Sequence, residues 1–316
     1  MKKRAFTLVE LLVVVAIIAL LVGLLLPALA KAQQTAKTVK DSNQIKQIHT
    51  AMVGRANETK GGRLPLPGYI DRKPVTGVGG GEIPGEGDED DTQNKTQFLY
   101  SACVAQQLFN TDILVGATEV NAVVKPYTNY DYSKYQPSAD NYWDPNMKAD
   151  IDKAPGQGDC HVSYAHMMLT GFRKANHWRN DLDSSRPHFS TRGCNNGKVD
   201  GTPAYEFSPT LRLHGPQKSW EGNVCFGDTH MEFTETFRPD GVFYECGTGQ
   251  WSNLSKDNLF ACGGTTNNVE FAGDNCVDKQ NGTTLQPWAG GDTMLAITPG
   301  NVTKYIAIPK YDAVEN

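Results

Sequence analysis

Hydrophobic and polar residues are distributed unevenly along the 316-residue chain. An uncharged apolar run occupies residues 11–30, and a helix of that length spans ~30 Å, the thickness of a bilayer's hydrocarbon layer. Beyond it, apolar residues such as Val39, Ile45, Ile48 and Met52 recur at helical spacing, and lysines occupy other positions. The pattern predicts one helix over residues 6–56, apolar in its first half and amphipathic in its second.

The remainder, residues 57–316, is predicted to form a globular head outside the cytoplasm. It is rich in Gly, Pro, Asn and Thr, which favours strands and long loops. The fold class is therefore α+β, with the long helix packed on a mainly antiparallel β-sheet. A helix is predicted over residues 91–110, and residues 160–316 are predicted to be mostly strands and loops. Irregular segments are expected at residues 63–91, 144–158, 176–201 and 246–287.

The clearest strand signal is a hairpin. Residues 223–226 and 229–234 alternate as short strands do, and Gly227-Asp228 between them is typical of a tight turn. Further short strands are predicted at residues 119–124, 160–165, 241–244, 294–297 and 303–308.

The net charge changes sign near residue 60, close to the predicted end of the long helix. The first 60 residues hold nine basic and three acidic side chains, whereas the remainder holds 21 basic and 32 acidic side chains, a net charge of −11. An acidic head repels phosphates, so nucleic acid is not expected as a partner.

The residues before the apolar run resemble a processing signal. Lys2, Lys3 and Arg4 would remain on the cytoplasmic side of a membrane. A secretory signal is cleaved after its apolar run, whereas the small residue here, in Ala5-Phe6, precedes it. Cleavage at that point would leave the apolar helix on the mature protein.

The sequence Ala5-Phe6-Thr-Leu-Val-Glu10, followed by the apolar run, resembles the processing and methylation signal of type IV prepilins and type II secretion pseudopilins. The resemblance implies that a prepilin peptidase removes residues 1–5 and methylates the new amino group of Phe6. It also implies that Glu10 neutralises the amino terminus of an adjacent subunit; a lone carboxylate beside lipid usually has a partner. Ala5 stands where this family usually carries Gly.

Two residues weaken the apolar helix. Pro27 removes a backbone hydrogen bond, and Gly23 precedes it by about one turn. Filaments of the resembled family have an unwound stretch in this region, so Gly23 and Pro27 are candidate assembly residues. A simple kink remains the alternative.

A second resemblance lies downstream, where His230 is followed by Asp240-Gly241. This spacing resembles pilin-like proteins with a His-X9-Asp-Gly motif, although Gly227 and Thr229 stand where Ala and Gly are usual. A metal or general-base role would need His230 and the aspartates to converge. Turn residues explain the same pattern, and we assign no catalytic residue, metal or cofactor.

Seven cysteines suggest disulfides if the head is exported. The odd count leaves at least one thiol unpaired within the chain, and Cys225, in an apolar strand, is predicted to be buried and free. The other six are candidates for disulfides: Cys103, Cys160, Cys194, Cys246, Cys262 and Cys276. Glycosylation sequons occur at Asn57, Asn94, Asn253, Asn281 and Asn301.

Both resemblances imply a structural subunit of a type IV pilus-like filament, a helical homopolymer assembled through the N-terminal helix. Its partners would be copies of itself, the prepilin peptidase and the inner-membrane assembly machinery. The precursor would reside in a bacterial inner membrane and the filament at the cell surface. One alternative is a pseudopilin or minor subunit of a type II secretion apparatus in the periplasm. Another is a membrane-anchored extracytoplasmic binding protein or hydrolase.

Overall fold

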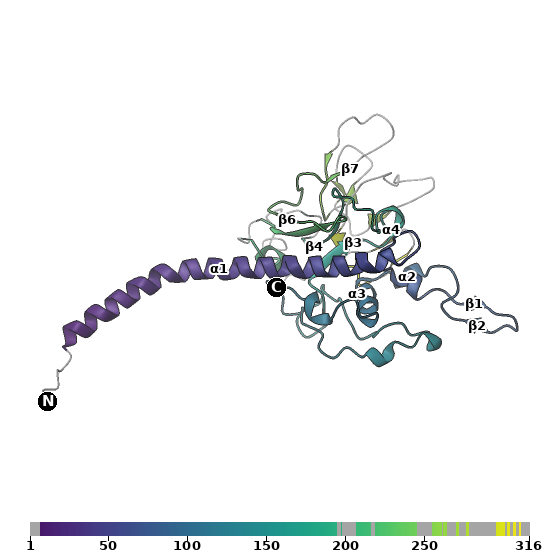
Figure 1. Cartoon of the computed structure of the whole chain (residues 1–316), viewed down its shortest axis with the longest axis horizontal. Coiled ribbons are helices and arrows are strands. Elements are labelled where there is room, and N and C mark those ends of the chain that lie inside the picture. Colours follow the sequence, from purple (N-terminus) through teal and green to yellow (C-terminus); the bar gives the residue numbers. More distant parts are fainter. Residues whose placement is uncertain are drawn as a thin grey trace.

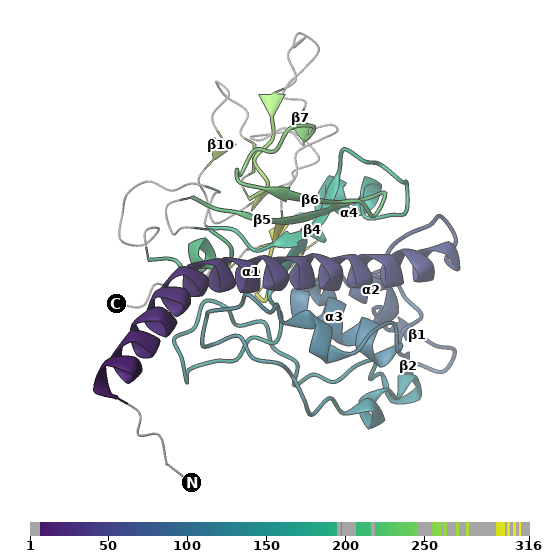
Figure 2. The same ribbon diagram turned by 60° about the vertical axis from the view of Figure 1, so that its left-hand side comes forward.

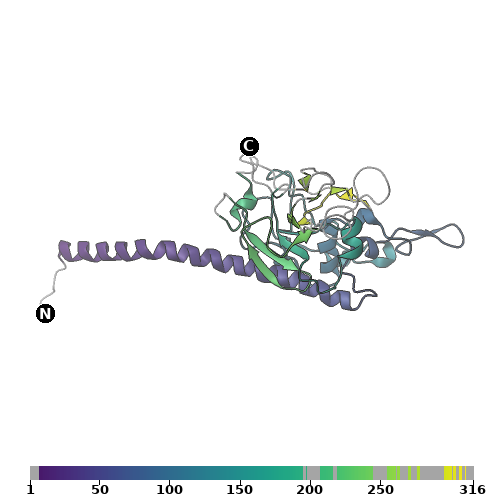
Figure 3. The ribbon, with the colours of Figure 1, turned by 90° about the horizontal axis from the view of Figure 1, so that it is seen from above.

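One long helix, α1, carries a head at its C-terminal half and projects beyond it at its N-terminal half (Figures 1 and 3). The computed structural model describes residues 7–194, 197, 207–215, 219–244, 255–260, 262–263, 270–271, 276–277, 295–300, 302–303, 306–307 and 310. The head has a five-stranded sheet on one side of α1 and a layer of short helices and loops on the other (Figure 2). This is the α+β, pilin-like architecture expected from the sequence.

Helix α1 extends from Leu8 to Asn57 without interruption, and Pro27 lies inside it. Thr7 is its N-cap, where the threonine side chain accepts a hydrogen bond from the backbone N–H of Glu10. Such a cap satisfies a donor that the helix leaves unpaired. The helix ends before Gly61 and Gly62, both of which have positive φ, a conformation that favours glycine.

The C-terminal half of α1 forms part of the core of the head. Ile45, Ile48 and Met52 are fully buried, as the helical spacing predicts. The buried face begins at Asp41, so Val39, which the sequence pattern places on that face, is exposed instead. We call the part of α1 that packs on the head, from Asp41 to Asn57, the docked half. It starts about one turn later than the apolar periodicity suggests.

The central sheet has the strand order β12-β3-β4-β5-β6, and every neighbouring pair is antiparallel. Helix α1 lies against β5 and β4 (Figure 2). The sheet therefore covers one side of the docked half of α1. Its strands are β12 (Leu295–Ala296), β3 (Tyr164–Met167), β4 (Pro187–Thr191), β5 (Gly222–Phe226) and β6 (Met231–Thr234).

The predicted hairpin is confirmed. Strands β5 and β6 pair in antiparallel register, with Gly222 opposite Thr234 and Cys225 opposite Met231. The connection runs through Gly227-Asp228, and Thr229 adopts a positive φ of 71°. A non-glycine residue in this region is uncommon and is tolerated mainly in tight turns.

Several expectations about strands in the head are wrong. Segments 63–91 and 246–287, expected to be irregular, contain two-residue strands. Residues 119–124 form no strand, because the carboxylate of Glu119 accepts hydrogen bonds from the backbone of Val120 and Asn121 and folds the segment into a turn. Strand β4 lies in the segment 176–201, which was expected to be irregular. Its first residue, Pro187, is a strand breaker in most positions but is tolerated at the start of a strand.

On the other side of α1, helix α3 (Thr96–Ala105) is shorter than the predicted helix over 91–110. Residues Asp91–Gln93 form a separate 3-10 turn, η1, capped by Asp90. Helix α3 ends before Gln107, whose positive φ of 58° does not continue a helix. Asp91 forms an ion pair with Lys174, which also binds Glu89.

The remaining elements are short. The predicted strands at 241–244, 294–297 and 303–308 are observed as the two-residue strands β7, β12 and β13, whereas 160–165 corresponds to β3 with a later start. The helical segments are α2 (Pro67–Ile70), η2 (Thr111–Leu114), η3 (Tyr132–Lys134), η4 (Pro137–Ala139), α4 (Gly171–Asn176) and η6 (Pro209–Arg212). The strands are β1 (Val75–Thr76), β2 (Glu82–Ile83), β7 (Phe243–Tyr244), β8 (Ser255–Lys256), β9 (Cys262–Gly263), β10 (Glu270–Phe271), β11 (Cys276–Val277) and β13 (Ile306–Ala307).

One cysteine that was a candidate for a disulfide is a free thiol instead. Cys225 is a buried free thiol, as predicted, but Cys103 is also buried and free rather than part of a disulfide. Cys103 lies within α3, where the surrounding core raises the pKa of its thiol. Cys160 and Cys194 are also buried, and no disulfide joins any two of these four residues. The structure does not describe the side chains of the other three candidates, Cys246, Cys262 and Cys276.

Candidate assembly surface

The projecting half of α1 carries most of the exposed large hydrophobic side chains among the described residues. Its Val, Leu and Ile side chains from Leu8 to Leu29 are all exposed, and no part of its most apolar stretch is buried by the head. Within the described residues, α1 is the one helix long and apolar enough to cross a membrane. An apolar surface of this size marks a place where a soluble protein meets another protein or a lipid.

Glu10 and Thr7 form a closed pair at the start of this surface. The Glu10 carboxylate accepts hydrogen bonds from the backbone N–H of Thr7 at 2.8 Å and from its hydroxyl at 2.8 Å. The Thr7 hydroxyl in turn accepts from the backbone N–H of Glu10 at 3.2 Å. This reciprocal arrangement is a capping box. It holds a negative charge within one turn of the predicted cleavage site.

Gly23 and Pro27, the expected weak points, do not interrupt the helix in this state. A Cβ added to Gly23 would meet no atom within 4 Å, so no neighbour within the chain requires a glycine there. Unwinding at these positions upon assembly therefore stays a prediction.

A polar cluster fixes the start of the docked half of α1. The carboxylate of Asp41, which is 1% exposed, accepts hydrogen bonds from the backbone N–H of Ala117 at 2.5 Å and from the hydroxyl of Thr118. Gly116 allows this close approach, because a Cβ there would lie 3.1 Å from the carboxylate. A buried carboxylate is tolerated when its oxygens accept hydrogen bonds in this way.

Histidines hold the helix to the sheet. The Nε2 atom of His49 on α1 lies 3.0 Å from Nδ1 of His188 on β4, and both residues are fully buried. Closer to the projecting half, His214 is hydrogen-bonded to Thr38 of α1 at 3.0 Å and to Thr191 of β4 at 3.3 Å. Burial lowers the pKa of His188 to about 4 and that of His214 to about 4, because a charged ring is poorly solvated there. Both rings are therefore neutral near pH 7.

A groove lies beside α1 on the side away from the sheet. Two adjoining cavities, of about 540 and 690 Å³, share Asn43, Gln47, Asp112 and Ile113 in their walls. Val39 and Ala36 line its end nearest the projecting half, and Leu108 and Phe109 line the other. We call this surface the side groove. Val39 in its wall is exposed, as are the apolar residues of the projecting half.

The motif residues His230, Asp240 and Gly241 lie in turns. His230 precedes β6, where its Nδ1 lies 2.5 Å from Asp228 and its ring stacks on Phe226 with centroids 4.2 Å apart. Burial opposes ionisation of Asp228, but the hydrogen bonds and charge of His230 prevail and lower the pKa of that carboxyl. Gly241 has a positive φ of 88° and follows Asp240 in a turn. These contacts fit a structural role at the hairpin.

Clustered metal ligands are not found in the described part of the chain, where no group of three or more His, Cys, Asp or Glu residues converges. Cys160 and His161 likewise make structural contacts. The thiol of Cys160 donates to the carbonyl of Val162, and His161 accepts a hydrogen bond from the backbone of Lys148.

The glycosylation candidates separate by exposure. Asn57, at the end of α1, is exposed. Asn94 is fully buried, and its amide bonds the backbone of Gly68 and the carboxylate of Glu89, so its candidacy was wrong. The other three, Asn253, Asn281 and Asn301, lie outside the described residues.

Comparison with known proteins agrees with the geometry. Residues 1–26 match the prokaryotic N-terminal methylation motif, which is typical of type IV pilins and pseudopilins. No curated protein and no solved structure matches the chain. The chain thus joins an N-terminal signal typical of type IV pilins and pseudopilins to a long apolar helix and an α+β, pilin-like head.

Proposed function

We propose that this protein is a structural subunit of a type IV pilus-like extracellular filament that polymerises through the projecting half of α1. The observation that carries the proposal is the continuity of α1. Its docked half is part of the core of the head, whereas its projecting half has no partner among the described residues. A rigid connection of this kind lets contacts made by the apolar helix position the whole head.

The projecting half suits two environments in turn. Before assembly, lipid covers its side chains, because about 20 apolar residues span a bilayer. Lipid tails are as apolar as leucine, so helix association within the membrane depends on packing rather than on a hydrophobic gain. Outside the membrane, the same side chains would face water, and burial against other copies then stabilises the polymer by roughly 25 cal/mol for each Å² of apolar surface.

The side groove supplies a receiving surface on the head. Its walls combine apolar Val39 and Ile113 with polar Asn43 and Gln47, a composition suited to an interface that is exposed in the monomer. The helix of a neighbouring copy packed there would continue the contacts made by the projecting halves.

Glu10 has a defined role in this proposal. Cleavage before Phe6 places a new positive amino group next to Thr7, which already binds the Glu10 carboxylate. A carboxylate at this depth in lipid is costly without a partner. In the polymer, Glu10 pairs with the amino terminus of an adjacent subunit and thereby sets the register between subunits.

Substitution of Glu10 tests the role of this charge. Glu10→Ala and Glu10→Val retain the apolar length of α1, so both variants should insert into membranes as the wild type does but enter filaments several-fold less. Glu58→Ala, which removes a carboxylate at the other end of the same helix, is the matched control. Incorporation of both Glu10 variants at the wild-type level would contradict the role of the charge.

The place of assembly separates a pilus subunit from a pseudopilin. We expect electron microscopy to find filaments outside the cells with this chain as their main component. Short assemblies confined to the periplasm would instead identify a subunit of a secretion apparatus.

A further inference from the structure

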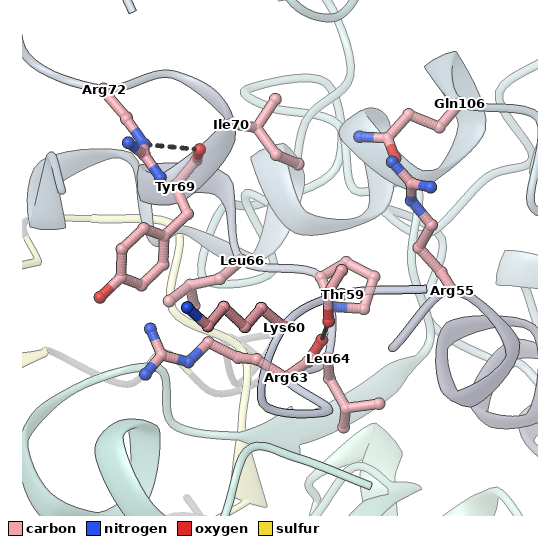
Figure 4. Close-up of a pocket in the computed structure, with 11 residues that line it drawn as sticks. Arg55, Thr59, Lys60, Arg63, Leu64, Leu66, Tyr69, Ile70, Arg72 and Gln106 are labelled. Carbon is pink, nitrogen blue, oxygen red and sulfur yellow. Dashed lines mark hydrogen bonds between the residues drawn. The ribbon is translucent and has the colours of Figure 1, made fainter. Parts of the chain in front are cut away.

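A second surface, a basic cleft, lies where α1 ends. The cleft has a volume of about 460 Å³ and lies between the last turn of α1, the segment that follows it, and α2 (Figure 4). Four cationic side chains line it: Arg55, Lys60, Arg63 and Arg72. It is at the opposite end of α1 from the projecting half (Figure 1).

The charges of the basic cleft are largely unbalanced. No acidic side chain lines the cleft, although residues 61–316 carry a net charge of −11. Arg55 pairs with Glu58 at 2.5 Å, but Lys60, Arg63 and Arg72 make no ion pair with any residue that the structure describes. Like charges held close together repel one another, and a bound anion relieves that repulsion.

Two of the four cations lie over an aromatic ring. The guanidinium carbon of Arg63 lies 4.6 Å from the centroid of the Tyr69 ring, and that of Arg72 lies 5.6 Å from it. Nε of Arg72 also donates to the backbone carbonyl of Tyr69 at 3.3 Å (Figure 4). These contacts orient both guanidinium groups before any ligand arrives, which lowers the cost of binding.

The floor of the basic cleft is rigid and apolar. Leu64 and Leu66 are buried in the core of the head. Trp178 fixes this segment: its indole N–H donates to the carbonyl of Pro65 at 2.8 Å, and its own carbonyl accepts from the N–H of Leu64 at 3.3 Å. Above this fixed segment, Tyr69 is exposed and Ile70 is half-buried, so the cleft presents cations at its edge and these two side chains as its accessible apolar lining.

We propose that the basic cleft binds an acidic sugar, namely a carboxylate-bearing unit of an anionic polysaccharide. Its volume is within the range of small-ligand sites. Arginine binds a carboxylate through two parallel hydrogen bonds, and the apolar floor and Tyr69 suit the C–H face of a sugar ring. A small inorganic anion would leave that floor unused, and a long nucleic acid would be repelled by the acidic head.

This inference goes beyond the proposed function, because it requires only that the head lies outside the cytoplasm. The basic cleft lies at the C-terminal end of α1, far from the projecting half, and shares no lining residue with the side groove. A filament of such subunits would carry one acidic-sugar site on each head.

A binding experiment with the full chain in neutral detergent tests the proposal. The probe is a fluorescent galacturonate trimer, and its dissociation constant is measured by anisotropy. We expect the double variant Arg63→Gln/Arg72→Gln to raise this constant at least tenfold, and Tyr69→Leu to raise it severalfold. The matched control, Lys125→Gln/Lys134→Gln, removes two exposed cations elsewhere on the head and should bind as the wild type does.

Other ligands show whether the cleft recognises the charge of the trimer, its sugar rings or both. The methyl-esterified trimer keeps the sugar rings but lacks the charges, and we expect it not to bind. Equal affinity for the ester, or no loss of affinity in the double variant and in Lys60→Gln, would overturn the proposal. Competition by inorganic phosphate or by an oligothymidylate at the same concentration as the trimer would show that the cleft does not recognise sugar and would overturn the assignment.

Discussion

The two halves of α1 form one continuous helix but meet different surroundings. The projecting half is apolar on all sides and exposed, whereas the docked half buries Ile45, Ile48 and Met52 together with polar Asp41 and His49. A helix that is apolar all round is a membrane or core element, and one with a single apolar face is a surface element. The boundary between the halves therefore separates contacts made within the chain from contacts reserved for lipid or other copies.

The polar contacts of the docked half give specificity that apolar packing alone lacks. His49 reaches β4, and Asp41 reaches the backbone at Ala117. These partners fix the rotation of α1 relative to the sheet, since a helix turned by one residue would leave a buried carboxylate without hydrogen bonds. The projecting half has no such restraint and can exchange lipid for protein neighbours.

We expect the largest difference between the two halves of α1 when an isoleucine in each half is replaced by alanine. Ile48→Ala removes a fully buried side chain and should lower the free energy of unfolding of the head by about 2–5 kcal/mol. Ile18→Ala, at a side chain that is 52% exposed, should change it by less than about 0.5 kcal/mol. Chemical denaturation of the full chain in detergent, followed by tryptophan fluorescence, measures both. Equal effects would mean that the halves do not differ as described.

Acid should lower the free energy of unfolding of the head, because histidines at the contact between α1 and the sheet are buried in their neutral form. The pKa of His188 and that of His214 are each about 4 in the folded protein, against 6.5 as the ordinary value. The unfolded chain therefore binds more protons below about pH 6.5, and stability is lost as the pH falls from about 6.5 towards about 4. At about pH 5 the loss is about 2 kcal/mol for each histidine.

Thermal unfolding at about pH 7.5 and about pH 5 measures this loss. His214→Gln should reduce the difference between the two melting temperatures, because one of the protons is no longer taken up on unfolding. The same melting temperature at both pH values in the wild-type protein would contradict the role of the buried histidines.

A substitution in the side groove should have a smaller effect, and only on incorporation into filaments. Val39→Glu places a charge in the groove and should lower incorporation into filaments about tenfold, equivalent to about 1.4 kcal/mol, without changing the stability of the head. Val120→Glu is the matched control, because Val120 is 50% exposed and Val39 is 53% exposed, but Val120 does not line the groove. Equal incorporation of the two variants would remove the groove from the interface.

The smallest effect is expected at the start of the projecting half. Thr7→Val removes the N-cap hydroxyl and should weaken the first turn of α1 by about 1 kcal/mol. Amide hydrogen exchange at Glu10 measures this change in the uncleaved chain. Thr35→Val, which removes a hydroxyl bonded within the same helix, should leave that exchange unchanged.

The sequence predicts α1 and the β5–β6 hairpin well, because both depend on local signals: periodicity in the helix, and Gly227-Asp228 in the turn. It misses β4, the central strand, since Pro187 resembles a loop residue until the strand is seen to begin there. It also misses the contacts of His49, whose partner His188 is 139 residues away. Such pairs are set by the tertiary fold and have no local signal.

The basic cleft could be predicted from the sequence only in part. Arg55, Lys60, Arg63 and Arg72 are close in sequence, so their clustering is visible in the chain itself. The position of Arg63 over the ring of Tyr69 depends on the turn after α1, where Gly61 and Gly62 have positive φ. A search for basic residues near the end of the amphipathic helix would have found the charges but not the cavity.

Mass spectrometry of the mature N-terminus, taken from assembled material, shows whether the leader is removed and the apolar helix retained. We expect a chain that begins at Phe6, carries one methyl group on its amino nitrogen and retains the whole of α1. A chain that begins after Ala30, or one that keeps residues 1–5 and remains monomeric in solution, would contradict this expectation.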